Sequence, residues 1–364
     1  MYEEGKARVK YHSEAFLNPV ARFLRDLSVE IVKMEANRNS RVLDATAATG
    51  IRGIRYALET KAKDITMLDI NESAYKDAKR NAAFNKIKAR VLHQSIQEFA
   101  NTTDERFDFI DYDPFGGVSP SIFDLLKITK SGGWLMFTAT DAAVLCGAHP
   151  KACLKLYDAV PLHNELCHEV GLRILIGYVV RLASQFDYGI EVKLALVYAH
   201  YMRVFVKLKH GSEDATRSLS ELGYAYYCNS CGNRYWRKGA VPKPDTKCCA
   251  KAQSNTLISG KMWLGNLYDK ELVSRLITEL DGRTEKAGLK TLSLISDEPD
   301  VPLYYSIPMT TKKMGVPGVS PLVILDMLKN EGFAASRPHF DISSIKTDAK
   351  IDDIKRLVQE ALSR

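Results

Sequence analysis

The segment RVLDATAATGIRGIRYALE, residues 41–59, decides the fold. Residues 42–45, which begin with Val42 and Leu43, predict a short buried strand. Small residues follow, and Ile51, Ile54 and Leu58 then recur at the spacing of one helix face. A strand, a tight turn and a helix in this order are typical of a doubly wound α/β sheet, in which ligands bind at the carboxyl ends of the strands.

The residues after this unit continue the same alternation. Short apolar runs alternate with helical periodicity as far as residue 209, which predicts a largely parallel sheet flanked by helices. A helix from Asn71 or Ser73 towards Asn85 has good capping residues. A long apolar stretch, residues 170–182, predicts a buried helix. The further strands are expected at residues 64–68, 90–92, 107–111, 134–138 after the Gly132-Gly133 turn, and 190–198 and 203–208 as a closing hairpin.

The composition becomes polar around residues 211–217, and we place a domain boundary there. The sequence therefore predicts an α/β domain, residues 1–211, and a smaller α+β domain, residues 212–364. In the second domain we expect one helix over residues 269–286, a helix that opens at Ser320-Pro321, and an extended segment at 333–340, an order that weakly resembles a winged-helix element.

Composition limits the class of protein. The chain has 364 residues, a hydrophobic fraction of 46% and a formal net charge of +7. This positive charge suits a polyanionic partner, although an ordinary basic enzyme has the same charge. No apolar run has the length of a membrane span, and the start lacks the apolar core of a secretory signal. We therefore expect a cytoplasmic protein without a membrane partner, and nothing in the sequence predicts an obligate protein partner.

The turn after the first strand favours a cofactor without phosphate groups. Dinucleotide-binding turns carry G-x-G-x-x-G, but alanine and threonine replace the first glycines here. S-adenosylmethionine needs only small side chains beside the backbone, and the alanines of this turn provide them. Asp44 ends the first strand and is a candidate for cofactor binding. Asp69 ends the second strand, from which a carboxylate can accept both ribose hydroxyls, although a surface aspartate before a helix would look the same.

The segment Asp113-Pro114-Phe115-Gly116 directly follows the fourth predicted strand. Acid, proline and aromatic residue in this order recur in enzymes that methylate the amino groups of bases. Such an amine is a poor nucleophile, because its lone pair is delocalised into the ring, so an acceptor such as Asp113 must take its hydrogen bond and its proton. Phe115 can stack on an extruded base. A structural Asp-Pro turn with a buried phenylalanine is the alternative.

Several long segments of the chain resemble one family. The segments that carry the resemblance are FLNPVARFLRDLSV, LDATAATGIRGIRYALE, DPFG, ATDAAVLCGAHPKACLKLY and ELCHEVGLRILIG, and the resemblance as a whole runs almost from end to end of the chain. They are similar to the tRNA guanine-26 N2-dimethyltransferases. The resemblance implies a Rossmann-like class I methyltransferase sheet, a carboxyl-terminal domain that binds tRNA, S-adenosylmethionine as the methyl donor, and one or two methylations of the guanine amine.

The resemblance also implies roles for individual residues. Arg25 and Arg52 would contact the carboxylate of the cofactor's methionine part, Asp69 its ribose, and Ser95 and Ile96 its adenine. Phe16 and Phe115 would sandwich the target guanine, with Asp113 at its amine. Without the family, Arg25 would look like a solvated charge and Phe16 like a core aromatic residue.

Two other functions fit parts of this pattern. An acid-proline-aromatic segment would also suit methylation of adenine or cytosine amines in DNA or RNA. A non-catalytic RNA-binding protein that keeps the fold is a rival from another class, although Asp69 and Asp113 are both present. The identity of the methylated nucleoside distinguishes the two kinds of methyltransferase, and the absence of any methylated nucleoside indicates the non-catalytic protein.

Four clustered cysteines predict a structural zinc site. Cys228 and Cys231 have the spacing of a zinc knuckle, but Cys248 and Cys249 are adjacent, which is less usual, and free or partly ligating cysteines are the alternative. Four thiolates would leave no open position for chemistry. The neighbouring residues 235–238, Tyr-Trp-Arg-Lys, can contact RNA or form a solvated loop.

The remaining cysteines and two histidines are expected to be structural. Cys146, Cys153 and Cys167 are scattered among apolar residues and are interpreted as small buried hydrophobes. His163 and His168 are interpreted as buried structural residues rather than catalytic ones.

Overall fold

The computed structural model describes residues 1–10, 17–244 and 248–363. The chain forms two compact units, and it passes between them several times. In the described ranges, no helix is long and apolar enough to cross a membrane. Unit 1 contains Met1–Thr140, Leu182–Thr216 and Glu271–Leu289, and unit 2 contains Asp141–Arg181, Arg217–Lys270 and Lys290–Arg364.

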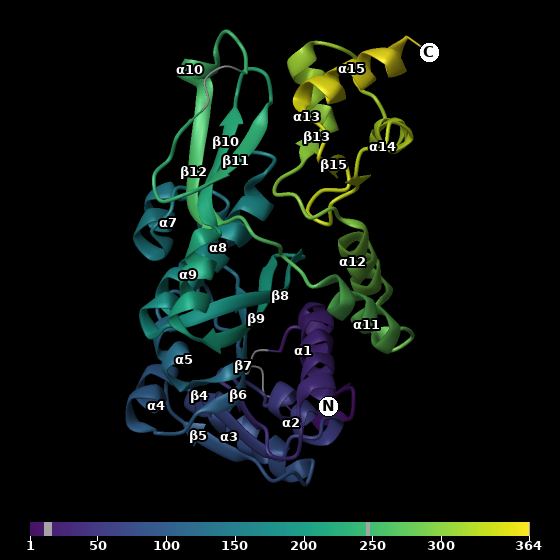
Figure 1. Ribbon diagram of the computed structural model, residues 1–364. Coiled ribbons are helices and arrows are strands. Elements are labelled where there is room, and N and C mark those ends of the chain that lie inside the picture. The colour runs from purple at the N-terminus through teal and green to yellow at the C-terminus, as the bar shows by residue number, and fades with distance from the viewer. Residues whose placement is uncertain (11–16, 245–247, 364) are drawn as a thin grey trace. The chain divides into compact units, whose positions relative to one another are not determined.

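Unit 1 is built on a seven-stranded sheet with the order β5-β4-β3-β6-β7-β9-β8 (Figure 1). Strands β3 to β7 are parallel, whereas β9 is antiparallel to both β7 and β8. This confirms the predicted α/β class and the closing hairpin. The strands are β3 (Arg41–Asp44), β4 (Asp64–Asp69), β5 (Arg90–His93), β6 (Phe107–Tyr112), β7 (Thr129–Ala139), β8 (Tyr188–Tyr198) and β9 (Tyr201–His210).

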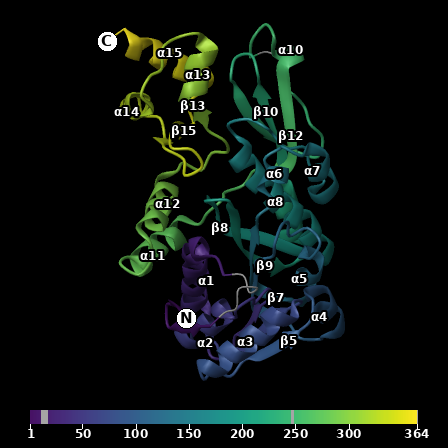
Figure 2. The ribbon, with the colours of Figure 1, turned by 180° about the vertical axis from the view of Figure 1, so that it is seen from behind.

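Helices cover both faces of this sheet. Helices α1 and α2 lie on one side, and α4 and α5 pack together on the other (Figures 1 and 2). Their buried apolar residues and those of the central strands form the core of the unit. The helices are α1 (Arg22–Glu35), α2 (Ile51–Glu59), α3 (Glu72–Phe84), which packs against α2, α4 (Ile96–Thr102) and α5 (Ile122–Ile128).

Strand β7 begins earlier than predicted. We expected a turn at Gly132-Gly133 before the strand, but both glycines lie inside β7. Its register against β6 shifts between Phe107 and Phe109, and Gly132 has a φ of 78°. The glycines therefore form an irregular beginning of the strand, which local sequence cannot distinguish from a turn.

Unit 2 contains a three-stranded antiparallel sheet with the order β11-β10-β12. Residues 235–238 belong to β11, so the alternative of a solvated loop was wrong. Most of the polar stretch at 211–217 belongs to α9, and the division between the two units falls inside this helix, after Thr216. The helices and strands in this part of the chain, with α9 divided between the two units, are α6 (Ala142–Leu145), α7 (Pro150–Tyr157), α8 (Cys167–Ala183), α9 (Ser212–Ser220), β10 (Leu222–Cys228), β11 (Arg234–Lys238), α10 (Ala252–Asn255) and β12 (Thr256–Trp263).

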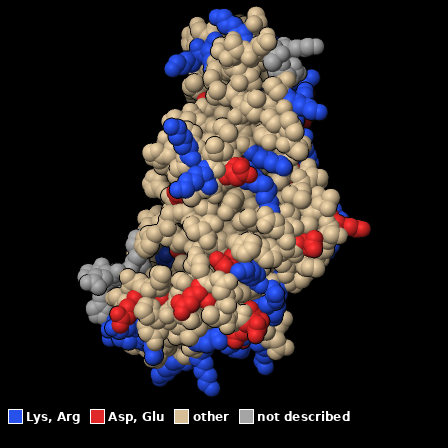
Figure 3. Space-filling view, turned by 90° about the vertical axis from the view of Figure 1, so that its left-hand side faces the viewer, with Lys and Arg blue, Asp and Glu red and all other residues tan. Residues whose placement is uncertain are grey.

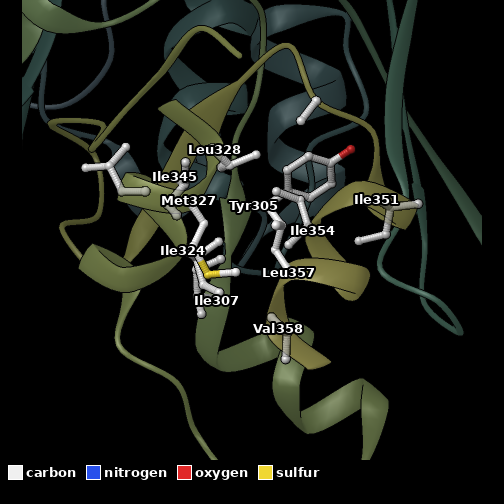
Figure 4. Close-up of a cluster of buried hydrophobic side chains, with 12 residues drawn as sticks. Tyr305, Ile307, Ile324, Met327, Leu328, Ile345, Ile351, Ile354, Leu357 and Val358 are labelled. Carbon is white, nitrogen blue, oxygen red and sulfur yellow. The ribbon is translucent and has the colours of Figure 1, made fainter. Parts of the chain in front are cut away.

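The C-terminal part of unit 2 has its own apolar cluster (Figure 4). Helix α14 begins directly after Ser320, as predicted. Of the predicted extended segment, only Ala335 and Ser336 pair in a sheet. The cluster is enclosed by α13 (Ile307–Met314), α14 (Pro321–Asn330), α15 (Ile351–Leu362) and the short strands β13 (Tyr305–Ser306), β14 (Ala335–Ser336) and β15 (Ser344–Thr347).

The helix predicted over residues 269–286 ends early, and a second helix that was not predicted follows it. Helix α11 (Lys270–Leu280) ends before a turn at Gly282, which has a φ of 68°, and α12 (Lys286–Asp297) follows. The left-handed conformation at glycine ends the first helix.

A group of buried charges lies in unit 2. Glu298 accepts hydrogen bonds from His339 at 2.6 Å and from Tyr268 at 2.5 Å. Lys346 lies 2.9 Å from Glu169 and 3.4 Å from Glu298. Burial opposes ionisation of Glu298, but His339 and Lys346 outweigh it and lower the pKa of this carboxyl to about 2.

Candidate active site

A pocket of about 720 Å³ opens at the carboxyl ends of the parallel strands of unit 1. Its volume lies in the range of small-molecule sites. Seven of the predicted site residues line it: Arg25, Arg52, Asp69, Ser95, Ile96, Asp113 and Phe115. Phe16 lies outside the described residues, and Asp44 is not among the residues that line the pocket.

The turn after β3 packs its backbone closely against neighbouring strands. Ala47 donates a backbone hydrogen bond to Leu68, and Ala48 donates one of 2.8 Å to Oδ2 of Asp69. Ala48 has a φ of 48° and Gly50 one of 79°, so the turn passes through the left-handed region before α2 begins. Small side chains therefore suit both the backbone conformation and the space in the pocket.

Arg52 is surrounded by carboxylates at the floor of the pocket. Its Nη2 lies 3.1 Å from Asp44, and its Nη1 lies 2.8 Å from Oδ2 of Asp113 and 3.4 Å from Asp111. The carbonyl and hydroxyl oxygens of Thr46 also accept hydrogen bonds from Nη2. A planar guanidinium can satisfy several acceptors at fixed angles, which explains why arginine occupies this position.

A second arginine, Arg203, supports this group from below. It is buried and donates to Oδ2 of Asp111 at 2.7 Å, and Tyr56 donates to the same oxygen at 2.6 Å. Burial opposes ionisation of Asp111, but Arg203 and Arg52 outweigh it and lower its pKa. Burial instead raises the pKa of Asp44 to about 6, although Arg52 opposes this effect. The floor of the pocket is thus a paired ionic network rather than a set of isolated charges.

The segment after β6 forms a defined turn. The backbone N–H of Asp113 donates to the hydroxyl of Thr46 at 2.8 Å, which ties this turn to the turn after β3. The backbone N–H of Gly116 donates to the side-chain hydroxyl of Thr140, the backbone N–H of Thr140 donates to the carbonyl of Gly116, and Gly116 has a φ of 84°. The Phe115 side chain is 78% exposed while it lines the pocket, so the alternative of a buried phenylalanine in this turn was wrong.

Arg25 lies on α1 and lines the pocket, and its guanidinium is paired with a carboxylate. Glu4 accepts two hydrogen bonds from it, at 2.8 and 2.6 Å, and the carbonyl of Asn18 accepts a third. Arg55 also contacts Glu4, at 2.8 Å. A guanidinium has five N–H groups, so Arg25 keeps donor capacity towards the pocket. The strand β1 (Tyr2–Glu4), which supplies this carboxylate, was not among the predicted elements.

The expected adenosine-binding residues lie along one wall of the pocket. Asp69 accepts from Ala48 with one oxygen and from Asn71 with the other, at 2.8 Å each. Each carboxylate oxygen can accept a further hydrogen bond. Ser95 caps α4 through Glu98, and Ile96 presents an apolar side chain beside it.

Sequence reasoning missed several residues of the pocket, among them three polar ones, Asn18, His200 and Tyr201. Asn18 donates its side-chain amide to the hydroxyl of Tyr201, and both line the pocket beside His200. Burial and the nearby Asp113 raise the pKa of Tyr201. Asn18 lies in the first of the family-like segments, FLNPVARFLRDLSV, whereas Tyr201 and His200 follow the β8 strand far along the chain. No local pattern links them to the rest.

The four clustered cysteines of unit 2 do come together. The sulfurs of Cys228 and Cys249 are 3.7 Å apart, as are those of Cys231 and Cys248. Four sulfurs at about 2.3 Å from one tetrahedral zinc would be about 3.8 Å apart. The adjacent pair therefore does not prevent a four-sulfur cluster, and all four atoms lie within 4.8 Å of one another.

The other cysteines and the two histidines differ from expectation. Cys153 is buried, as predicted, but Cys146 and Cys167 are only half-buried. His163 and His168 are exposed, so their interpretation as buried residues was wrong. Cys167 and His168 begin α8, and the first turn of a helix does not place each residue towards the core.

Comparison with known proteins agrees with this fold. The model of one protein family, N2,N2-dimethylguanosine tRNA methyltransferase, matches residues 1–359. The tRNA (guanine(26)-N(2))-dimethyltransferase of Pyrococcus horikoshii is 37% identical, over 98% of both chains, and that of Thermococcus kodakarensis is 39% identical, over 95% of both.

A solved structure is similar over the same length. Trm1 from Pyrococcus horikoshii, in complex with S-adenosyl-L-methionine, has a TM-score of 0.90 with 36% identity and 98% coverage of each chain. Agreement in sequence and in fold over nearly the whole length leads to one conclusion. The chain belongs to the N2,N2-dimethylguanosine tRNA methyltransferase family and is a methyltransferase.

Proposed function

We propose that this protein transfers methyl groups from S-adenosylmethionine to the N2 amine of guanine 26 in tRNA, once or twice. The observation that carries the proposal is the contact between two turns: Asp113, in the turn after β6, shares Thr46 and Arg52 with the turn after β3. A proton acceptor is thereby fixed beside the proposed cofactor turn. The relatives' names supply the target base.

The pocket suits a cofactor with a positive sulfonium and no phosphate. Alanines line the turn after β3, and Asp69 stands at the end of β4, where a carboxylate suits the ribose. We assign Arg25 and Arg52 to the carboxylate end of the cofactor, and Asp44 acts through its contact with Arg52. Ser95 and Ile96 border the adenine. When bound, S-adenosylmethionine supplies an activated methyl group.

Asp113 has the central chemical role in this proposal. It accepts the hydrogen bond of the guanine amine, and it takes the proton as the new N–C bond forms and the S–C bond breaks. Arg52 holds Oδ2 of Asp113, and in the described part of the chain Oδ1 accepts no hydrogen bond. Oδ1 is therefore the oxygen that we assign to the amine.

Phe115 stacks on the target base. Its ring is exposed at the pocket, where a base that leaves its helix can lie against it. We assign the opposite face of the base to Phe16, which lies outside the described residues.

We propose that residues 1–211 bind the cofactor and that residues 212–364 contribute most of the tRNA contacts. All described residues that line the pocket fall between Leu17 and Tyr201. On the face shown in Figure 3, Lys and Arg side chains stand in separate groups with Asp and Glu between them. Binding then rests on dispersed phosphate contacts, to which β11 can add Trp236 and Arg237, and it should weaken steeply as salt rises.

The cysteine cluster holds one structural zinc ion in this proposal. Two sulfur–sulfur distances of 3.7 Å fit the edges of a tetrahedron around zinc. The cluster joins the end of β10 to the segment before α10. It has no part in methyl transfer, because four thiolates leave no open position on the metal.

The proposal is tested by measuring the transfer of labelled methyl groups from the cofactor to tRNA. The purified chain is incubated with an unmodified tRNA and methyl-labelled cofactor, the RNA is digested, and the labelled nucleosides are identified. We expect N2-methylguanosine and N2,N2-dimethylguanosine, and no label in a matched tRNA with adenine at position 26. Label in adenosine or cytidine would favour the other amine targets. Salt-sensitive binding of tRNA without any labelled product would favour a non-catalytic RNA-binding protein.

A further inference from the structure

Cys146, Cys167 and His168 form a second cluster of metal-ligating side chains, separate from the four cysteines. Their two sulfurs and one ring nitrogen all lie within 4.8 Å of one another. Cys146 directly follows α6, whereas Cys167 and His168 are the first residues of α8. All three belong to unit 2, and none of them lines the methyltransferase pocket.

We propose that these three side chains bind a second metal ion of the zinc class. Two thiolates and one imidazole are a ligand set that favours zinc, because the metal accepts sulfur and nitrogen in tetrahedral geometry. Ligand atoms this close need only small rotations to converge on one ion. Three protein ligands leave one position, and the exposure of His168 allows water to take it.

The third cysteine of this region provides a contrast. Cys153, on α7, is fully buried and does not belong to the cluster. It therefore has the packing role that we first assigned to all three cysteines. Cys146 and Cys167 are instead half-buried, and they stand beside a histidine that solvent reaches.

The local backbone holds the two cysteines in position. His163 contacts the carbonyl of Cys146 through Nδ1 at 3.1 Å, and the backbone N–H of Cys167 donates to Asn164 at 3.0 Å. A bound metal would close the segment between Cys146 and Cys167, which contains α7. The site would then stabilise this part of unit 2 by a crosslink within the chain.

The experiment isolates the second site by removing the first. In the full chain with Cys228→Ser and Cys231→Ser, titration with Co²⁺ should give one equivalent of bound metal with a sulfur-to-cobalt charge-transfer band. Adding Cys146→Ser should abolish the band, and adding Cys153→Ser should leave it unchanged. Circular dichroism and cofactor binding check that each variant is folded.

A substitution of His168, the exposed ligand, tests the site in a variant that should still fold. His168→Gln should keep the fold, weaken cobalt binding at least tenfold and shift the visible bands. The proposal is overturned if the Cys228/Cys231 variant binds no cobalt, or if Cys146→Ser binds it as before. Loss of exactly two reactive thiols without reductant, reversed by Cys146→Ser, would show a disulfide with Cys167 and would also overturn it.

Discussion

Arg52 donates a hydrogen bond of 2.8 Å from Nη1 to Oδ2 of Asp113, so the proposed proton acceptor and a proposed cofactor-binding residue form one ion pair. The same guanidinium reaches Thr46 and Asp44, at the end of β3. The end of β6 and the beginning of α2 are thereby connected through a single side chain. The chemistry of Asp113 and the placement of the cofactor turn should respond together when Arg52 changes.

Replacement of Asp113 by asparagine should separate catalysis from cofactor binding. Asparagine keeps the shape and an oxygen that can accept from Arg52, but it cannot take the proton of the amine. We expect kcat to fall roughly 10²- to 10⁴-fold, while isothermal titration gives an affinity for S-adenosylmethionine that changes little. Asp104→Asn, at an exposed position outside the pocket, is the matched control. An Asp113→Asn enzyme with an ordinary kcat would remove this residue from the mechanism.

Arg52→Lys should cost both stability and cofactor affinity. Lysine cannot satisfy Thr46, Asp44 and Asp113 at once, and it leaves buried carboxylates without full compensation. Removing one partner of a buried ion pair costs about 3–5 kcal/mol, and this is the upper limit for lysine, which keeps the positive charge. Thermal unfolding and cofactor titration measure the two effects.

The control for Arg52→Lys is the same substitution near the surface. Arg41 pairs with Asp64 at 2.8 Å and with Glu105 at 3.1 Å, but solvent reaches all three side chains. Such pairs contribute about 0–1 kcal/mol. Equal loss of stability in the two variants would contradict the ionic network as the basis of the pocket floor.

Phe115→Ala should impair tRNA recognition without harming the fold. The ring is largely exposed, so its removal leaves the core intact. Stacking on a base contributes about 1–3 kcal/mol, or roughly 5- to 150-fold in binding of the substrate in its reactive state. We expect kcat/KM for tRNA to fall within this range, with Phe115→Tyr close to the wild type.

Phe107 offers the opposite pattern as a control. It is buried at the beginning of β6, outside the pocket, with its ring centroid 6.0 Å from that of Phe99. Phe107→Leu should lower the melting temperature while kcat/KM for tRNA, measured well below that temperature, stays unchanged. If Phe115→Ala behaved in the same way, its role would be packing rather than recognition of the base.

The parts of the site that could be predicted from sequence are those that lie at strand ends. In a parallel sheet the carboxyl ends of strands meet at one edge, so Asp44, Asp69 and Asp113 could be placed near one another from the positions of three apolar runs. Glycine and small residues marked the turn after β3. The sequence pattern therefore predicted the sheet, the edge of the sheet at which the site lies, and the three aspartates at that edge.

Contacts between distant segments could not be predicted in this way. The hydrogen bond between Asn18 and Tyr201 joins residues far apart in the chain, and the pairing of Arg25 with Glu4 depends on a hairpin of only three residues per strand. Neither of these contacts is marked by a periodic pattern of residues in the sequence. The convergence of Cys146 with His168 likewise depends on how α6 and α8 pack, which local spacing does not encode.

Lowering the pH should destabilise the fold of unit 2, because Glu298 becomes protonated. His339 and Lys346 overcome burial and hold the pKa of this carboxyl near 2, below the ordinary value of 4.5. A lowered pKa stabilises the fold above pH 4.5, and this contribution, on the order of 3 kcal/mol, is lost as pH falls towards 2. Glu298→Gln should reduce stability at pH 7 and flatten its decline between pH 5 and pH 3, as measured by urea denaturation. Glu331→Gln, at a surface pair with Arg356, should leave that decline nearly unchanged. If Glu298→Gln unfolds with the same pH dependence as the wild type, the charge of Glu298 does not govern the acid sensitivity of this unit.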